Sequence, residues 1–249
     1  MRFDILTLFP GIFASFLSES LLAKGLAKGL LSVNLVDIRD FCLDRRRAAD
    51  DRPYGGGPGM VLKPEPLALA LDSVLAAPGP RPLIVHLTPS GRLLNQALVR
   101  ELAGRPRLAL ICGRYEGIDQ RVFDVYGDLE ISVGDYVVNG GEVPAMLLIE
   151  ALVRLIPGFL GHEESSLDES HSRGLLEGPI YTRPRVWRGR EVPGLLLTGH
   201  HAQAAAFRLA EAVAKTKAVR PELLDDPRLT DATVEFFRRP GSPLKSRQD

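Results

Sequence analysis

Short apolar runs alternate with longer stretches of helical periodicity over the first 156 residues, and this alternation restricts the fold more than any other feature of the sequence. The runs are rich in Val, Ile and Leu, which favour strands. We expect strands at Phe3–Leu8, Leu31–Ile38, Leu83–Leu87, Leu108–Cys112 and Leu129–Val133. We expect helices near Gly11–Leu22, Pro66–Leu75, Asn95–Leu102 and Gly141–Ile156. This order predicts an α/β fold with a mostly parallel sheet covered by helices.

The pattern changes after Pro157-Gly158. The polar stretch GHEESSLDESHSRG has no periodicity and predicts an exposed linker. Beyond it, Ala202–Ala214 is alanine-rich and helical, and shorter helical pieces follow near Pro221–Leu224 and Ala232–Phe237. The 249 residues therefore predict a large domain at 1–160, a linker at 161–173 and a small helical C-terminal domain at 174–249.

Composition narrows the classes of partner and compartment. Lys plus Arg equals Asp plus Glu at 31 each, so any contact with a polyanion must come from local patches. Only two cysteines occur, Cys42 and Cys112, which is too few for a secreted disulfide scaffold. The N-terminal sequence lacks a signal peptide, and no window has the roughly 18 apolar residues of a membrane span. We expect a soluble, cytoplasmic protein without a membrane partner.

The common nucleotide and metal motifs are absent. The first expected strand leads into TLFPGIFASF, which lacks the G-x-G-x-x-G of a dinucleotide fold. The run YGGGPGMVLK has glycines but no Gly-Lys-Ser/Thr, so a P-loop for ATP or GTP hydrolysis is excluded. The five histidines stand at no zinc-ligand spacing with the cysteines, so no metal site is assigned.

Three glycine-rich segments point to a binding site. They are DDRPYGGGPGM (Asp50–Met60), ICGRYEGID (Ile111–Asp119) and SVGDYVVNGGE (Ser132–Glu142). Glycine lets the backbone adopt positive φ angles and approach a ligand closely. In open α/β sheets, ligands bind beyond the carboxyl ends of the strands, where two of the segments begin. Each segment alone also fits a flexible loop or a tight turn, but three in one chain favour a site.

Six motifs resemble, in the same order, those of the TrmD family of tRNA (guanine-N1)-methyltransferases, which belongs to the SPOUT superfamily. They are DDRPYGGGPGM, CGRYEGID, GDYVVNGGEVPAM, PGFLGHEES, GLLEGPIYTRP and LLLTGHHA. The resemblance implies a trefoil knot, rare among proteins, that binds S-adenosylmethionine in a bent shape. It implies methyl transfer to N1 of the guanosine at position 37 of tRNA, next to the anticodon. It also implies a homodimer with shared active sites. Members of the family generally depend on Mg²⁺, and the sequence leaves open whether this chain does.

The resemblance assigns the cofactor to three loops and the start of the helix after them. Backbone groups of these loops would hold most of the cofactor, and Pro144 fits the first turn of a helix, where its missing N–H costs little. The implied residues are Leu87, Pro89, Gly113, Tyr115, Glu116, Gly117, Val133, Gly134, Asp135, Tyr136, Val137, Val138, Gly140, Gly141 and Pro144.

Methylation of guanine N1 requires a base for the N1 proton and a partner for the charge that gathers on O6. Arg154 matches the family's catalytic arginine, although an ion pair with Glu150, four residues earlier on the same helix, is an alternative. The family's base is an Asp directly before a serine, whereas this chain reads Asp168-Glu169-Ser170. The register with Ser170 favours Glu169, and Asp168 is the alternative.

Local basic and aromatic residues predict contact with RNA, and the resemblance implies that this RNA is tRNA and that DNA is not a partner. Arginine suits phosphate contacts and aromatic rings suit stacking on unpaired bases. Arg45–Arg47 precede the first glycine-rich segment, and four arginines surround Trp187. A solvated basic face is the alternative interpretation. The implied substrate-binding residues are Asp50, Arg52, Tyr54, Gly55, Gly56, Gly57, Arg183 and Arg185.

Two other classes of function are open at the level of sequence. A related knotted methyltransferase acting on ribose 2′-hydroxyls or ribosomal RNA would share the cofactor loops but lack the DDRPYGGGPGM and YTRP segments and the acidic linker. A non-catalytic RNA-binding module would explain the arginines but not the glycine-rich segments.

Overall fold

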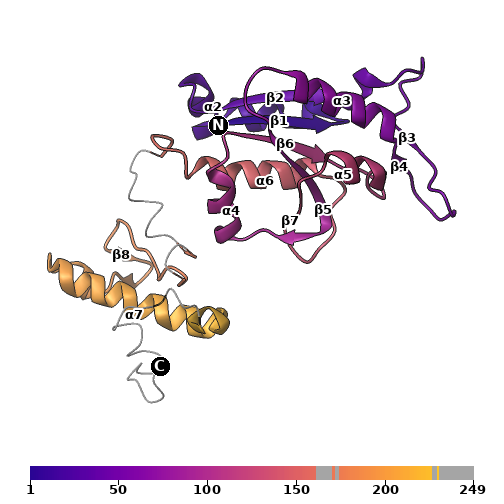
Figure 1. Cartoon of the computed structure of the whole chain (residues 1–249). Helices are drawn as coiled ribbons and strands as arrows, with labels where there is room; N and C mark the ends of the chain where they lie inside the picture. Colours follow the sequence, from indigo (N-terminus) through magenta and orange to yellow (C-terminus); the bar gives the residue numbers. More distant parts are fainter. Residues whose placement is uncertain (161–169, 172–173, 226–228, 230–249) are drawn as a thin grey trace. The chain divides into compact units, whose positions relative to one another are not determined.

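A computed structural model describes residues 1–160, 170–171, 174–225 and 229 (Figure 1). The chain divides into two compact units, Met1–His162 and Glu163–Asp249. Most of the predicted linker at 161–173 lies outside the described residues. No helix in the described part is long and apolar enough to cross a membrane.

The first unit is built on a five-stranded parallel sheet in the order β2-β1-β6-β5-β7. Every residue of the central strand β6 is buried. The α/β class with a parallel sheet is therefore confirmed, and the trefoil knot stays a prediction. The strands are β1 (Arg2–Thr7), β2 (Ser32–Asp37), β5 (Leu83–Leu93), β6 (Arg107–Cys112) and β7 (Leu129–Ser132).

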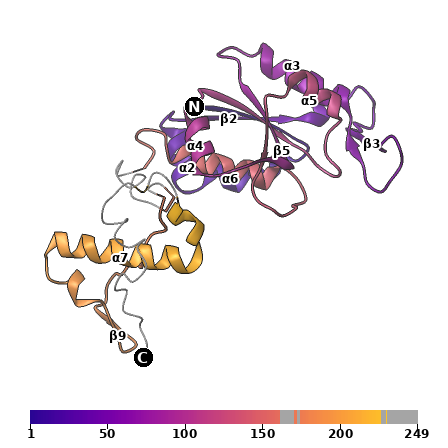
Figure 2. The same ribbon diagram turned by 60° about the horizontal axis from the view of Figure 1, so that its bottom comes forward.

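Helices cover both faces of this sheet because alternate strand residues point to opposite sides. Leu108 and Leu110 of β6 pack with α4 and α6, whereas Ala109 and Ile111 pack with α3 and α5. Figure 2 shows α3 and α5 on one side and α4 and α6 on the other. The helices are α1 (Ala14–Ser18), α2 (Ser20–Ala27), α3 (Pro64–Ala76), α4 (Gln96–Ala103), α5 (Gln120–Tyr126) and α6 (Glu142–Val153).

Three local features differ from the sequence expectations. The single helix expected near Gly11–Leu22 is wrong, because Glu19 is extended and Ser20 has a φ of 57°, which separates α1 from α2. A 3₁₀ helix at Pro10–Phe13 precedes them. The sequence did not predict α5 or the short antiparallel hairpin of β3 (Asp50–Asp51) and β4 (Val61–Leu62).

A buried ion pair joins the neighbouring strands β1 and β6 near their amino ends. Nε of Arg107 donates to Asp4 at 2.7 Å, and the two side chains are 1% and 0% exposed. Arg107 also donates to the carbonyls of Val74 and Pro80, at the end of α3 and in the turn after it. Burial alone would raise the pKa of the Asp4 carboxyl. Hydrogen bonds from Arg107, Arg2 and Asn34 outweigh that effect and hold the pKa below its usual value.

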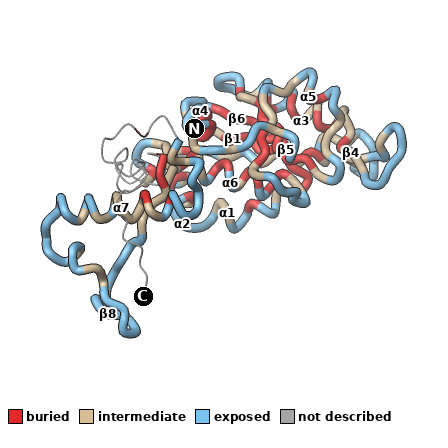
Figure 3. The backbone as a smooth tube through the Cα atoms, turned by 90° about the horizontal axis from the view of Figure 1, so that it is seen from below, coloured by how far each residue is buried: buried red, intermediate tan, exposed pale blue. Residues whose placement is uncertain are grey.

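The second unit is small and mainly helical. The helix predicted at Ala202–Ala214 is confirmed within α7 (His201–Val219), and the piece near Pro221–Leu224 lies within a 3₁₀ helix, Pro221–Asp225. The piece near Ala232–Phe237 falls outside the described residues. A two-stranded hairpin of β8 (Val186–Trp187) and β9 (Arg190–Glu191) precedes the 3₁₀ helix Gly194–Leu196. Most of this hairpin and much of α7 are exposed (Figure 3).

Removal of the cation from the buried pair should destabilise the first unit strongly. Arg107→Met leaves the Asp4 carboxylate buried without its main partner, so the free energy of unfolding should fall by about 3 kcal/mol or more. Arg81→Met is the matched control, because Arg81 pairs with Asp128 while 62% exposed and should cost less than about 1 kcal/mol. Urea titrations of both variants measure the difference, and equal losses would contradict it.

The pair of Asp4 and Arg107 should also affect how the free energy of unfolding changes at acid pH. Because the pKa of Asp4 is lower in the folded state than in the unfolded chain, its stabilisation is complete above the unfolded pKa. It is lost as the pH falls through the folded pKa. We therefore expect the free energy of unfolding of the wild type to fall below about pH 4, and less steeply in Asp4→Asn.

Candidate functional site

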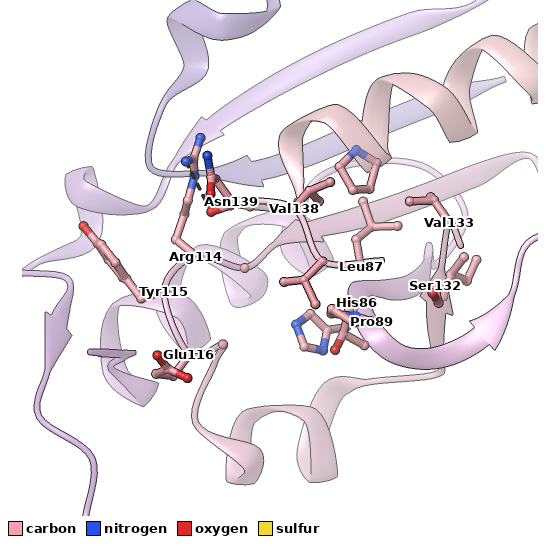
Figure 4. A pocket seen from close by; sticks show the side chains of 18 of the residues that line it. His86, Leu87, Pro89, Arg114, Tyr115, Glu116, Ser132, Val133, Val138 and Asn139 are labelled. Carbon is pink, nitrogen blue, oxygen red and sulfur yellow. Dashed lines mark hydrogen bonds between the residues drawn. The ribbon is translucent and has the colours of Figure 1, made fainter. Parts of the chain in front are cut away.

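A cavity of about 230 Å³ lies at the carboxyl ends of β6 and β7, beside the irregular pairing of β5 between Leu87 and Arg92. Three segments line it: 86–89 on β5, 113–117 after β6, and most of 131–141 from the end of β7 to the start of α6. Figure 4 shows side chains from all three segments around the cavity. This is the edge of a parallel sheet where ligands generally bind.

Most of the residues that the sequence implied for a cofactor meet at this cavity. Gly134 and Asp135 do not line it. The Ser132 hydroxyl donates to the carbonyl of Gly134 and accepts from its N–H. The implied residues that line the cavity are Leu87, Pro89, Gly113, Tyr115, Glu116, Gly117, Val133, Tyr136, Val137, Val138, Gly140, Gly141 and Pro144. Thr88, Arg114 and Asn139 also line the cavity and stand within the implied loops, although they were not singled out. Sequence reasoning missed His86, Ile131 and Ser132, which stand beside those loops.

Backbone hydrogen bonds join the two larger loops. The N–H of Gly141 donates to the carbonyl of Gly113 at 2.9 Å, and Arg114 pairs with Gly140 in an isolated antiparallel bridge. The loop after β6 also turns on itself, since Tyr115 and Gly117 have φ values of 59° and 115°. Two adjacent backbones thus form much of the wall and expose peptide groups to a ligand.

Gly141 is required by the closeness of these backbones. A Cβ at this position would lie 2.5 Å from the Cα of Cys112, a distance that real Cβ atoms do not show. Any larger residue would force β6 and the start of α6 apart.

Three polar side chains are held together beneath the loops. Glu142, 2% exposed in its side chain, accepts a 2.7 Å hydrogen bond from the Thr7 hydroxyl at the end of β1. Its other oxygen lies 2.9 Å from Nε of Arg114, an ionic contact whose angle does not make a hydrogen bond. The guanidinium of Arg114 stacks on the ring of Phe9, 4.7 Å from the centroid. The carboxylate of Glu142 is therefore engaged in structure.

Cys112 is a core residue rather than a nucleophile. It is fully buried at the end of β6. Burial raises the pKa of its thiol well above the usual value, and the nearby charge of Glu142 raises the pKa further. The thiolate that a nucleophile needs is therefore disfavoured.

The first glycine-rich segment is anchored on the cavity loop. The N–H of Glu116 donates to the carbonyl of Met60, and the N–H of Leu62 donates to that of Gly117, both at 3.0 Å. Gly59 packs closely on the side chain of Glu116, which would have to move to make room for a Cβ at this position. Asp50 lies half-buried in β3, whereas the implied substrate residues Arg52, Tyr54, Gly55, Gly56 and Gly57 are exposed.

The implied substrate residues of the second unit line another cavity. Its volume is about 820 Å³, and Arg183, Arg185 and Arg208 stand on its wall with mainly apolar neighbours. Arg185 donates to Glu191 of β9 at 2.7 Å, whereas Arg183 has no ion pair within the described residues. Trp187 is 58% exposed, with the guanidinium of Arg188 4.8 Å from its ring.

The implied catalytic residues are only partly described. Arg154 is half-buried and is the C-cap residue that follows α6. Glu150, the alternative ion-pair partner of Arg154, is exposed. Asp168 and Glu169 lie outside the described residues. The structure therefore leaves the choice between them as a prediction.

Comparison with known proteins gives one consistent result. The family model described as tRNA (Guanine-1)-methyltransferase TrmD matches residues 1–226. A relative from Chloroflexus aggregans is 54% identical over 224 residues, which cover 90% of this chain and 88% of the relative. Relatives from Treponema denticola and Geotalea uraniireducens are 51% and 48% identical and cover 92% and 95% of this chain, and 92% and 96% of their own lengths. All three carry the name tRNA (guanine-N(1)-)-methyltransferase.

The close approach at Gly141 gives a measurable expectation. Gly141→Ala should lower the free energy of unfolding by about 2 kcal/mol, because the added methyl group meets the backbone of β6, which cannot move easily. Gly11→Ala is the control, since a Cβ at Gly11 has nothing within 4 Å. Urea titration compares the two variants, and a Gly141→Ala protein as stable as Gly11→Ala would refute the steric argument.

Proposed function

The chain belongs to the TrmD family of tRNA (guanine-1)-methyltransferases, and on that premise we propose that it transfers a methyl group from S-adenosylmethionine to N1 of guanosine 37 of tRNA, beside the anticodon. The observation that carries the proposal is the cavity, where all but two of the implied cofactor residues meet. A non-catalytic RNA-binding module would not require such a cavity.

The lining of the cavity fits the chemistry of S-adenosylmethionine. Leu87, Pro89 and Val138 offer apolar surface for the adenine ring, and the peptide groups of the two loops offer hydrogen bonds. The carboxylate of Glu116 supplies negative charge for a ligand that carries a sulfonium and an ammonium group. We therefore assign the cofactor to this cavity.

The transfer itself requires two groups from the chain. When bound, S-adenosylmethionine supplies an electrophilic methyl group on a positively charged sulfur. Glu169 takes the proton from N1 as the bond from N1 to the methyl carbon forms and the bond from sulfur to that carbon breaks. Arg154 stabilises the negative charge that gathers on O6. Asp168, next to the base, orients it or raises its proton affinity.

Two surfaces of the chain are suited to tRNA. Arg52 and Tyr54 project from the exposed hairpin that is anchored on the cavity loop, where they are free to contact the nucleotides around guanosine 37. Arg183 and Arg185 in the second unit provide charge for phosphate contacts. We also propose a cytoplasmic location, which the two free cysteines support.

No residue of this chain is assigned to Mg²⁺. Within the described ranges, no three His, Cys, Asp or Glu side chains come close enough to hold a metal ion.

Methyl transfer to defined transcripts tests the function and the base together. With radiolabelled S-adenosylmethionine, the wild type should modify a tRNA transcript that carries guanosine 37, yield N1-methylguanosine, and leave a transcript with adenosine 37 unmodified. Glu169→Gln keeps shape and hydrogen bonding but cannot accept a proton, so its single-turnover rate should fall about 100-fold or more. Asp168→Asn is the matched control and should lose much less. A severe loss in Asp168→Asn with a near-normal Glu169→Gln would reverse the assignment, and label on a ribose would overturn the reaction.

The homodimer is proposed from one face of α6. Val143 and Leu147 are 61% and 42% exposed on this helix, and such apolar surface is commonly covered by a partner.

In a dimer with shared sites, Arg154 of one subunit acts with Glu169 of the other. A heterodimer of one Arg154→Ala and one Glu169→Gln subunit should then have one intact site of two, and so recover up to about half of the activity of the wild-type dimer. Purified heterodimers with no activity above either parent would contradict shared sites.

A further inference from the structure

His86 is a buried titratable residue on the cavity wall that the proposed transfer does not use. It lies on β5 with its side chain 8% exposed, and it lines the cavity beside Leu87. Glu130 is its partner in the register of the neighbouring strand β7, and Nδ1 of His86 lies 3.2 Å from the Glu130 carboxylate. The ring of Phe123 on α5 packs against it, with centroids 6.1 Å apart.

The contact with Glu130 selects one form of the imidazole ring. An ionised carboxylate only accepts hydrogen bonds, so Nδ1 must carry the proton. Burial lowers the pKa of His86 below its usual value, and the hydrogen bond and charge of Glu130 offset only part of that effect. At neutral pH the ring is therefore uncharged, with Nε2 as a hydrogen-bond acceptor.

The free nitrogen of this ring faces the loop after β6. A Cβ on Gly113 would lie 3.2 Å from Nε2 and 3.9 Å from Cδ2 of His86, so Nε2 is the nitrogen nearer to that loop. Figure 4 shows the ring among the groups that surround the cavity. Within the described residues, Nε2 has no hydrogen-bond partner. The cavity thus contains an acceptor that the described residues leave unused and that a ligand in the cavity could engage.

We propose that Nε2 of His86 accepts a hydrogen bond from an N–H or O–H group of the bound cofactor, and that cofactor binding requires the neutral ring held by Glu130. This inference rests on the proposed function in one respect, that the cavity binds S-adenosylmethionine. Protonation of Nε2 turns the acceptor into a donor, so the contact is lost and two donors face each other.

The charges around His86 determine the direction of the pH effect. Glu130 on β7 contacts the ring, Arg114 and Glu116 on the loop after β6 line the same cavity, and the residue of α5 that packs on the ring is the uncharged Phe123. Glu130 is the charged group that raises the pKa of His86. Affinity for the cofactor should therefore fall as the pH drops through the pKa of His86. In Glu130→Gln this decline should move to lower pH.

Calorimetric titration of the full-length protein with S-adenosylmethionine and S-adenosylhomocysteine tests the proposal between about pH 5.5 and about pH 8. His86→Leu removes the acceptor and should weaken binding of both ligands about tenfold at neutral pH. His86→Gln can place an uncharged amide oxygen near the position of Nε2. It should bind close to the wild type at neutral pH and show no decline in acid. His201→Gln, at the exposed start of α7 in the second unit, is the matched control and should keep the wild-type pH profile.

Several outcomes would overturn the proposal, and circular dichroism of each variant verifies that it is folded. Equal affinity of folded His86→Leu and wild type would overturn it. So would an acid decline that persists in His86→Gln. A decline seen with S-adenosylmethionine but not with S-adenosylhomocysteine would show charge repulsion with the sulfonium instead of a lost hydrogen bond. If the wild type binds neither ligand at any pH, the proposed function fails rather than the role of His86.

Discussion

The cavity depends on one buried carboxylate. Glu142 begins α6, accepts a hydrogen bond from Thr7 at the end of β1 and contacts Arg114 on the loop after β6. A buried carboxylate is tolerated only when it is paired, so these contacts hold together three segments that are far apart in the sequence. Beside them, Gly141 lets the backbone of α6 approach that of β6. The shape of the ligand site therefore depends on the polar contacts of Glu142 and on the absence of a side chain at Gly141.

Elements that depend on a continuous apolar pattern could be predicted from the sequence. Leu108–Cys112 is apolar without interruption because β6 is buried on both faces, which is typical of a central parallel strand. The hairpin of β3 and β4 could not be predicted, since each strand has two residues and no periodicity. The break between α1 and α2 depends on the positive φ of Ser20, a residue that does not itself signal such a break.

The candidate site was predictable to the extent that it is made of backbone. Dense glycine after a strand indicates a loop that approaches a ligand, and the segments around Gly113 and Gly140 do line the cavity. Side chains whose role depends on distant partners were missed. His86 stands in an apolar strand, and its proposed role depends on its contact with Glu130. Only the register of β5 and β7 brings these two residues side by side. Arg114 likewise lies within a quoted motif, but its contact with Glu142 depends on how two loops meet.

The loop of residues 113–117 lies between the cavity and the glycine-rich hairpin. Under the proposed function these two parts bind the cofactor and tRNA. On one side it lines the cavity, and on the other it receives hydrogen bonds from, and donates them to, the strand ends of the glycine-rich hairpin. Glu116 takes part in both, because it is one of the residues that line the cavity and its side chain packs on Gly59. The backbone of Glu116 is hydrogen-bonded to Met60, at the base of the hairpin, so a ligand that contacts Glu116 contacts a residue joined directly to that hairpin. Under the proposed function, the segment that binds the cofactor is thus linked by hydrogen bonds to the segment that contacts tRNA.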